Sequence, residues 1–508
     1  MDGADVPGSR TWRADPAEVR RGWHYEGLGW PRSLGVIRLW IVAVWAIIPL
    51  TIWGYVDIGP RGRIEPGRID RHMTDFTVFT EAGAAFFDGR NPYLVANPRG
   101  WHYLYPPLFA ILIAPLSVFD TESQVLIWYF VNVGLAFACL GEARRLWRLV
   151  SDRAEPRRSL WIVVCGGLAA LLPYLDCMQA GQLGIAILYL LIVGFRLVLQ
   201  GRSSRVRFLA GLVLALPAVV KLVPSLPVVF LLFQQWSAVA FSAGVRRPWG
   251  RATSLTAGVL TGAFLFLLAI PASLIGWQAN LAYLHVWHTR VVSNDRIGPN
   301  ANFNIHSVRN QSLANAVYLL MKSTARTTPS DFQAAARRDR PERLVHSWVR
   351  VVIGVILTLL VAVGLALRRR TDALDQATAY SLAVCATLLV SPLAWGHYYM
   401  AAVPAALCVP LWLSRHGMPR LAGVVAAIPP ILSWSYYIAM PYTGAIGLLG
   451  LGTTAWFLGV SGLILGIEIS FGPLGGKECQ SQFTAVKPLT REKCARLFDT
   501  SVAANAKL

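Results

Sequence analysis

Apolar residues run in long blocks along this chain, and short polar segments separate the blocks. Twelve blocks approach the ~20 residues that a helix needs to cross a bilayer. Several contain proline and glycine, which membrane helices tolerate because neighbouring groups satisfy the freed backbone. We therefore expect an all-α, polytopic membrane protein with spanning helices at residues 35–58, 123–141, 159–175, 182–200, 208–220, 223–240, 252–275, 349–367, 376–394, 398–413, 419–437 and 443–470.

A thirteenth apolar block, residues 104–119, is shorter and contains three prolines. If it crosses the membrane, every later Arg-rich short loop lies outside. If instead it forms a hairpin at the outer interface, the short loops that carry fifteen arginines become cytoplasmic, namely 144–158, 202–207, 246–251 and 368–370. The opposing short loops then hold one basic residue, Lys221. Short cytoplasmic loops are enriched in Lys and Arg, so we expect the hairpin, twelve spans and two cytoplasmic termini.

This topology divides the chain into three parts. Residues 1–34 form a cytoplasmic N-terminal segment, residues 35–470 the membrane domain, and residues 471–508 a cytoplasmic tail. Two long segments of the membrane domain lie outside, a first outer loop at 60–122 and a large outer loop at 276–348. We expect the protein in the plasma (inner) membrane, with its polar site facing the extracytoplasmic side.

Composition agrees with a membrane protein and changes the meaning of the charge. The 508 residues are 55% hydrophobic and 15% charged, whereas soluble domains carry about 25% charged residues. The net charge of +20 suggests nucleic acid at first sight, but much of it lies in the predicted cytoplasmic loops, where anionic membrane lipids explain it. The seven cysteines show no zinc or disulfide pattern, and no nucleotide-binding motif occurs. We expect no cofactor and no metal.

Polar residues gather on the predicted outer face. Asp75 precedes an expected amphipathic helix that runs to Asp88, and it is either a helix cap or a functional acid. Lys221, between Pro217 and Pro224, either snorkels to the interface or binds a ligand. His397 lies at an outer helix junction, where it is either an interfacial side chain or part of a site.

The large outer loop adds tryptophan, histidine and amide side chains. These groups suit recognition of a sugar or a lipid headgroup, and they equally suit packing at the membrane interface. His285 and His288 have the spacing of a metal pair but lack a third ligand. An Arg-rich stretch at 337–343 receives no role.

The ordered set of motifs resembles glycosyltransferase family 87, a group with the membrane-embedded GT-C architecture. The resemblance covers residues 70–400 and rests on Asp75 with Gly89-Arg90-Asn91-Pro92-Tyr93, Tyr105-Pro106-Pro107-Leu108 with Pro115-Leu116, Gly181-Gln182, Lys221-Leu222-Val223-Pro224, Asn310-Gln311-Ser312, and Ser391-Pro392 through His397. Tyr398 stands where many relatives carry a second histidine or an aromatic residue.

The resemblance implies an enzyme that moves a hexosyl unit, most often mannosyl, from a polyprenyl-phosphate sugar to a glycolipid or polysaccharide. Asp75 is then the general base of an inverting transfer. The expected donor-phosphate ligands are Lys221, His397 and Arg309, and the expected substrate-binding residues are Asn91, Tyr93, Tyr105, Gln182, Asn310, Gln311 and Trp395. The alternative is a transporter or a flippase of lipid-linked sugars, which twelve spans would fit equally well.

Overall fold

The computed structural model describes residues 45–65, 67, 71–151, 156–201, 203–240, 247–289, 307–324, 340–367 and 372–471. The predicted terminal segments 1–34 and 471–508 lie outside this part, apart from Phe471, as do residues 290–306 and 325–339 of the large loop. The chain divides into two units, Met1–Val56 and Asp57–Leu508. In the first unit the described residues are helical from 45 onward. Everything below concerns the second unit, apart from helix η1 at the boundary.

The described residues are mostly helical and hold no β-strand, only two isolated bridges. Seven helices are long and apolar enough to cross a membrane: Thr121–Val150, Leu160–Ala180, Trp249–Ile275, Trp348–Leu367, Ala373–Val390, Pro419–Ile438 and Leu448–Ile469. These seven coincide with seven of the twelve predicted spans. The protein is therefore a multi-pass membrane protein.

The full set of elements is η1 (Gly54–Ile58), η2 (Gly59–Gly62), α3 (Phe76–Phe87), α4 (Pro107–Ile113), η4 (Ala114–Val118), α5 (Thr121–Val150), α6 (Pro156–Ala180), α7 (Gly184–Gln200), α8 (Ser204–Val220), α9 (Ser225–Ala240), α10 (Arg247–Phe264), η5 (Leu265–Ala269), α11 (Ile270–Ile275), α12 (Trp277–Trp287), α13 (Leu313–Thr324), α15 (Arg340–Leu367), α16 (Ala373–Val390), η7 (Gly396–Ala402), α17 (Val403–Arg415), α18 (Pro419–Ile438), α19 (Met440–Thr443) and α20 (Leu448–Phe471).

Four more predicted spans appear as shorter helices. They are α7, α8, α9 and the pair η7–α17. The pair η7–α17 covers residues 396–415 and corresponds to the predicted span 398–413. The first predicted span, 35–58, is described only from residue 45. Four helices of 13–17 residues do not reach the length of an untilted span, so the count of twelve stays a prediction.

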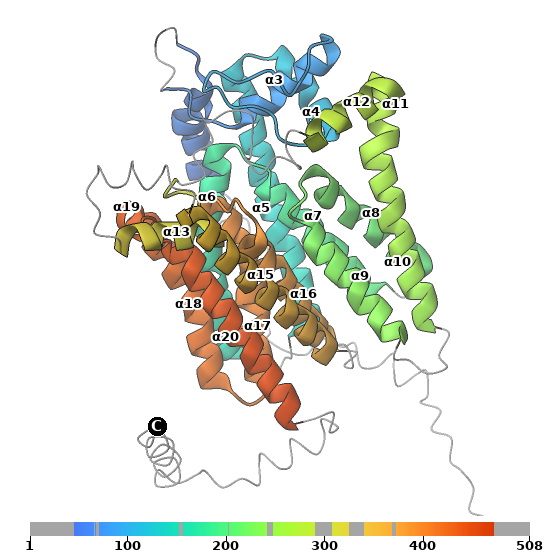
Figure 1. Cartoon of the computed structure of the whole chain (residues 1–508), viewed down its shortest axis with the longest axis vertical. Coiled ribbons are helices and arrows are strands. Elements are labelled where there is room, and N and C mark those ends of the chain that lie inside the picture. The colour runs from blue at the N-terminus through green and yellow to red at the C-terminus, as the bar shows by residue number, and fades with distance from the viewer. Residues whose placement is uncertain are drawn as a thin grey trace, which may run out of the picture. The chain divides into compact units, whose positions relative to one another are not determined.

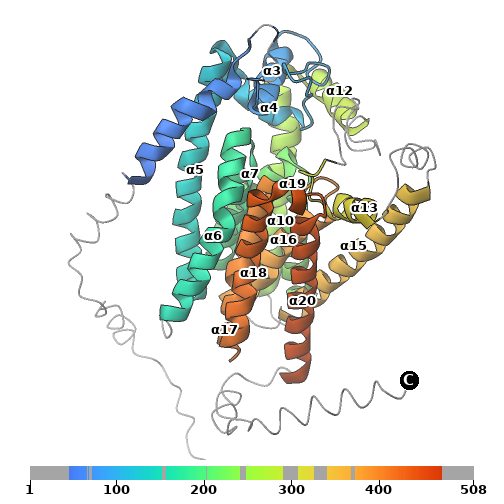
Figure 2. The ribbon, with the colours of Figure 1, turned by 90° about the vertical axis from the view of Figure 1, so that its left-hand side faces the viewer.

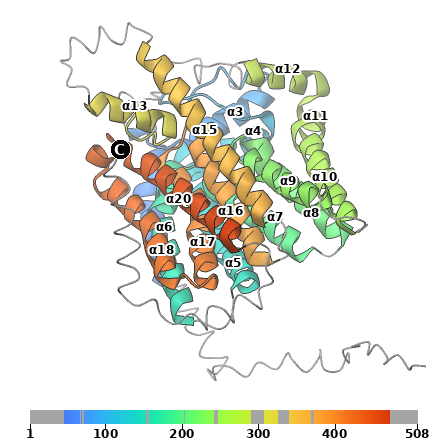
Figure 3. The same cartoon turned by 60° about the horizontal axis from the view of Figure 1, so that its bottom comes forward.

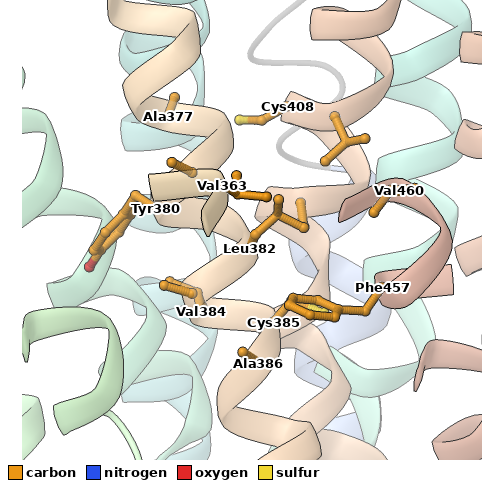
Figure 4. Packing of buried hydrophobic residues seen from close by; sticks show 14 of the residues in the cluster. Val363, Ala377, Tyr380, Leu382, Val384, Cys385, Ala386, Cys408, Phe457 and Val460 are labelled. Carbon is orange, nitrogen blue, oxygen red and sulfur yellow. The ribbon is translucent and has the colours of Figure 1, made fainter. Parts of the chain in front are cut away.

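The centre of the bundle is α16, which is buried along almost its whole length because alanine and other small residues occupy most of its surface. Figure 4 shows its residues from Ala377 to Ala386 packed between Val363 of α15, Cys408 of α17 and Phe457 of α20. Tyr380 stacks on Phe195 of α7 with ring centroids 4.2 Å apart. Figure 3 shows α15 alongside α16 and α20.

A layer of short helices lies at one end of this bundle (Figures 1 and 2). We call α3, α4, η4 and α12 the end layer. The expected amphipathic helix after Asp75 is confirmed as α3, and it packs on α4 and η4. Residues 104–119, predicted to form a hairpin, hold α4 followed directly by η4 as one helical stretch from Pro107 to Val118, so the hairpin stays a prediction. Trp287 of α12 donates a hydrogen bond to the Leu104 carbonyl at 3.2 Å. Aromatic contacts such as Phe79 with Phe109, 5.1 Å between centroids, fill its interior.

Candidate active site

Asp75 is held directly against the turn between α6 and α7. Its backbone N–H donates to the Ala180 carbonyl at 3.0 Å, and Trp128 donates to the Gly181 carbonyl at 3.1 Å. Gly181 has φ +70°, and a Cβ there would lie 2.8 Å from the Thr74 hydroxyl oxygen. Position 181 thus requires glycine for two reasons. The backbone is left-handed there, and the segment that carries Asp75 approaches it closely.

The Asp75 carboxylate does not cap α3, because no side-chain capping bond forms at the start of this helix. Instead it accepts a hydrogen bond from the Gln182 side-chain amide. Burial raises the pKa of Asp75 to about 6, although the Gln182 hydrogen bond and the electrostatic effects of His397 and Arg99 act to lower it. A carboxylate with such a pKa is still ionised near neutral pH and is a stronger base than an exposed aspartate.

Lys221 ends α8 and joins the same cluster. Its ammonium lies 3.6 Å from the centre of the Tyr398 ring and 5.7 Å from that of Tyr105, both within cation–π range. It forms no salt bridge with an acid in the described part of the chain. Burial lowers the pKa of Lys221 to about 7, while Cys177 and Asp75 act to raise it. The structure therefore holds a partly desolvated cation beside aromatic rings, with its charge open to an anion.

His397 belongs to η7 and faces α6. Its Nδ1 lies 3.6 Å from the Asp176 carboxylate oxygen Oδ2, to which the Tyr437 hydroxyl donates at 2.9 Å. The imidazole also meets the Tyr398 ring edge-to-face, 4.6 Å between centroids. Three elements distant in sequence, α6, η7 and α18, thereby converge beside Asp75.

Two arginines flank the cluster. Arg99, whose guanidinium lies 4.0 Å from the Trp101 ring centre, interacts with the charges of Asp75 and Arg309. Burial lowers the pKa of Arg99, and the like charge of Arg309 acts in the same direction. Arg309 itself is exposed, and its charge reaches Asp176. The predicted ligand Arg309 thus lies at the edge of the cluster rather than inside it.

The first loop brings Tyr105 into the cluster and keeps Asn91 and Tyr93 behind it. The Tyr93 hydroxyl donates to the Tyr105 carbonyl at 3.0 Å, and the Asn91 side chain accepts from the Tyr93 N–H at 3.0 Å. Asn97 ties this loop to α3 through its side-chain amide, which donates to the Thr74 carbonyl and the Thr77 hydroxyl. In this structure Asn91 and Tyr93 shape the loop that presents Tyr105.

Asn310 and Gln311 are fully buried and engaged with backbone groups. The Asn310 side-chain carbonyl accepts from the N–H groups of Ser312 and Ala394, and the Gln311 amide donates to the carbonyls of Val308 and Gly444. Trp395 pairs with Asn310 in an isolated bridge. These residues fasten the middle of the large loop to the segment 394–395 that precedes His397.

Sequence reasoning overlooked part of this cluster. Tyr398 was noted from the sequence, and Asp176 lies five residues before the Gly181-Gln182 motif, but neither received a role there. Arg99 and Tyr437 were not singled out. An acid inside an apolar helix end was a usable signal for Asp176. Nothing in the local sequence of Arg99 or Tyr437 places either near Asp75. Across the described residues, no three His, Cys, Asp or Glu side chains gather in a way that would hold a metal ion.

Fold and site together define a polytopic membrane protein with a polar, ionisable cluster at one end of its helix bundle. The family model described as glycosyltransferase family 87 matches residues 103–392, more than half of the chain, and this chain belongs to that family. The match decides between the two classes left open by the sequence, in favour of a glycosyltransferase over a transporter or flippase. Asp75 lies 28 residues before the matched range and His397 lies five residues after it.

Curated relatives are similar over most of their length. A Mycobacterium tuberculosis protein named polyprenol-phosphate-mannose-dependent alpha-(1-2)-phosphatidylinositol mannoside mannosyltransferase is 26% identical over 70% of this chain and 75% of its own. A Mycolicibacterium smegmatis protein of the same name is 23% identical over 81% of this chain and 85% of its own. Another from that organism, the corresponding phosphatidylinositol pentamannoside mannosyltransferase, is 23% identical over 71% and 73%. No solved structure matches the chain significantly.

Proposed function

We propose that this protein transfers a mannosyl unit from a polyprenyl-phosphate mannose to a glycolipid acceptor of the phosphatidylinositol mannoside kind. The observation that carries the proposal is the cluster in which a partly buried carboxylate, Asp75, lies near a partly desolvated cation, Lys221. A glycosyl transfer from a lipid phosphate needs both, a base for the acceptor and a cation for the leaving phosphate. The names of the relatives supply the sugar and the acceptor class.

Asp75 serves as the general base in this mechanism. An acceptor hydroxyl attacks the anomeric carbon of the donor, and its proton passes to the Asp75 carboxylate. The bond between the anomeric carbon and the phosphate oxygen breaks, and its electron pair stays on that oxygen. A single displacement inverts the anomeric centre, and the products are the glycosylated acceptor and a polyprenyl monophosphate. A positioned base of this kind contributes about 10²- to 10⁴-fold to the rate.

Lys221 and His397 stabilise the leaving phosphate. Charge develops on the phosphate as the sugar departs, and preorganised cations in a water-poor site stabilise it more strongly than water does. The Tyr398 ring holds the Lys221 ammonium in place without neutralising it. Arg309, exposed at the edge of the cluster, guides the phosphate toward this pair.

Sugar recognition falls to the polar groups around the base. Gln182 donates a hydrogen bond to Asp75, and its side-chain oxygen has no partner among the described residues, so Gln182 orients the base and can also bind a sugar hydroxyl. Tyr105 and Trp395 offer ring faces to a pyranose. Asn91, Tyr93, Asn310 and Gln311 contribute by shaping the loops, which is what their backbone hydrogen bonds support.

The end layer faces the extracytoplasmic side in this proposal. The Arg-rich short loops connect α5 with α6, α7 with α8, α9 with α10, and α15 with α16. The helix ends that these loops join lie far from α3 and α4 in Figure 1. The positive-inside tendency then puts these loops and both termini in the cytoplasm of a cell with this protein in its inner membrane. Twelve spans, with α7, α8, α9 and η7–α17 among them, satisfy that arrangement.

A reconstituted assay tests the proposed function. Purified protein in liposomes receives a radiolabelled polyprenyl-phosphate mannose and a phosphatidylinositol mannoside, with no ion gradient. The proposal expects labelled, elongated glycolipid with wild type and a loss of about 10²-fold or more with Asp75→Asn. Glu81→Gln in α3 is a control, because that acid lies on the same helix outside the cluster. Transfer by Asp75→Asn at the wild-type rate would refute Asp75 as the base.

A further inference from the structure

Gly396 allows the segment that carries His397 to approach α6 and α18 closely. A Cβ at position 396 would lie 2.8 Å from the Tyr437 hydroxyl oxygen and 3.3 Å from Asp176 Oδ2. Only the absence of a side chain permits this contact, since real Cβ atoms do not approach within 3.0 Å. The backbone before His397 is therefore built against Asp176 and Tyr437.

The two ring nitrogens of His397 have different surroundings. Nδ1 faces the Asp176 carboxylate, whereas Nε2 is buried and has no hydrogen-bond partner among the described residues. The side chain as a whole is only 8% exposed. A buried polar atom without a partner is destabilising, because it has lost its hydrogen bonds to water and gained none in return. A ligand group that bonds Nε2 would remove that cost.

Asp176 is itself fixed in place. The Tyr437 hydroxyl donates to its Oδ2 at 2.9 Å, and Oδ2 is also the oxygen that faces His397. The separation of 3.6 Å from Nδ1 exceeds a hydrogen bond, as is common for catalytic contacts before substrate binds. Arg309 and Asp75 are the other charged groups whose fields reach this pair.

We propose that Asp176 is a positioning residue that acts through His397. Its carboxylate holds the Nδ1 edge of the imidazole and stabilises the positive ring, so that Nε2–H donates to the phosphate of the lipid donor. The same division of labour occurs wherever a carboxylate orients a histidine by one nitrogen and frees the other. The inference rests on the proposed function, because it takes the lipid phosphate as the ligand of His397.

A double-mutant cycle with Asp176→Asn and His397→Gln tests the proposal. Asp176→Asn keeps the shape of the side chain and removes its charge, and we expect the KM for the polyprenyl-phosphate sugar to rise roughly 10- to 100-fold, the range typical of lost orienting partners. The KM for the acceptor stays unchanged. In the His397→Gln background Asp176→Asn adds no further loss, because the route of its effect is already gone.

A second variant and a matched control keep the test independent of folding. Tyr437→Phe removes only the hydroxyl that fixes Asp176, and it raises the donor KM by a smaller factor that also disappears in the His397→Gln background. Glu122→Gln exchanges an acid for its amide at an exposed ion pair with Arg63 and leaves the donor KM unchanged. The proposal would be overturned if the effects of Asp176→Asn and His397→Gln on the donor KM multiplied in the double mutant. An unchanged donor KM in Asp176→Asn would also overturn it.

Binding of polyprenyl monophosphate, measured without acceptor, separates this inference from the proposed function. Weaker binding by Asp176→Asn supports the inference even if no acceptor yet tried is glycosylated. Wild-type protein that binds the lipid phosphate but transfers no sugar counts against the proposed function alone. Equal binding by wild type and Asp176→Asn counts against the inference alone.

Discussion

Replacing Asp75 by asparagine should abolish catalysis and stabilise the protein at the same time. The side chain keeps its shape and still accepts the Gln182 hydrogen bond, but it no longer carries a buried negative charge. Loss of the base lowers the turnover by about 10²- to 10⁴-fold, which corresponds to roughly 3–5 kcal/mol of barrier.

The stability effect follows from the pKa of Asp75. Folding raises this pKa from 3.8 to about 6, so the folded protein binds the proton more tightly than the unfolded chain between these values. The wild type therefore loses stability as pH rises from about 4 to about 6, by at most about 3 kcal/mol for two pKa units. Asp75→Asn has no such loss. Its thermal midpoint should exceed that of wild type at pH 7.5, and the difference should shrink as pH falls toward 4.

The transfer assay checks the predicted loss of turnover. Thermal unfolding in detergent at pH 4.5, 6 and 7.5 checks the predicted gain in stability. Retained turnover would refute the role of Asp75 as base. A midpoint for Asp75→Asn that is equal to or below that of wild type at pH 7.5 would refute the argument from burial. If Asp75→Asn is inactive but no more stable than wild type, Asp75 is still the base. Its carboxylate is then less buried than the structure indicates.

Four further predictions concern the surroundings of the base. Lys221→Gln should raise the donor KM about 10-fold or more and leave the acceptor KM unchanged, since removal of a charge-assisted bond costs about 1.5–3 kcal/mol; equal changes in both would argue against a phosphate ligand. In wild type, kcat/KM should fall below pH 6 as Asp75 is protonated and above pH 7 as the Lys221 ammonium loses its proton, and the alkaline fall should vanish in Lys221→Gln. Gly181→Ala should lower the thermal midpoint and the turnover, because a Cβ would meet Thr74 and the φ of +70° disfavours alanine, whereas Gly167→Ala, with nothing within 4 Å, should do neither; equal behaviour of the two would contradict the tight turn. Tyr398→Phe should keep the donor KM within about threefold and Tyr398→Leu should raise it about tenfold, if the ring holds the ammonium by a cation–π contact of about 1 kcal/mol or more.

Much of the helix pattern could be predicted from the sequence because apolar length is a local property. Seven predicted spans and the helix α3 appear where the pattern put them. The predicted hairpin region holds the consecutive helices α4 and η4, and the hairpin itself stays a prediction. The pattern was less informative for α7, α8 and α9, since a helix of 16 or 17 apolar residues has the same composition whether it crosses the bilayer or ends within a bundle.

The site was predictable only where chemistry and local sequence coincide. Asp75, Lys221, Gln182 and His397 each stand out because polar groups are rare beside apolar spans, and the structure brings them together. The pairing of Asp176 with His397 depends on Gly396, which packs against Tyr437. Asp176 in α6 and His397 in η7 are more than 200 residues apart along the chain. Such a contact leaves no trace in either local pattern.

The measurement that bears most directly on the account is the anomeric configuration of the product formed by purified wild-type protein from polyprenyl-phosphate mannose and a phosphatidylinositol mannoside. The account predicts one new mannosyl residue, with the configuration opposite to that of the donor, released together with polyprenyl monophosphate and absent with Asp75→Asn. A product that retains the donor configuration would contradict direct displacement with Asp75 as base, and no mannosylated product from active, lipid-reconstituted protein would contradict the proposed reaction itself.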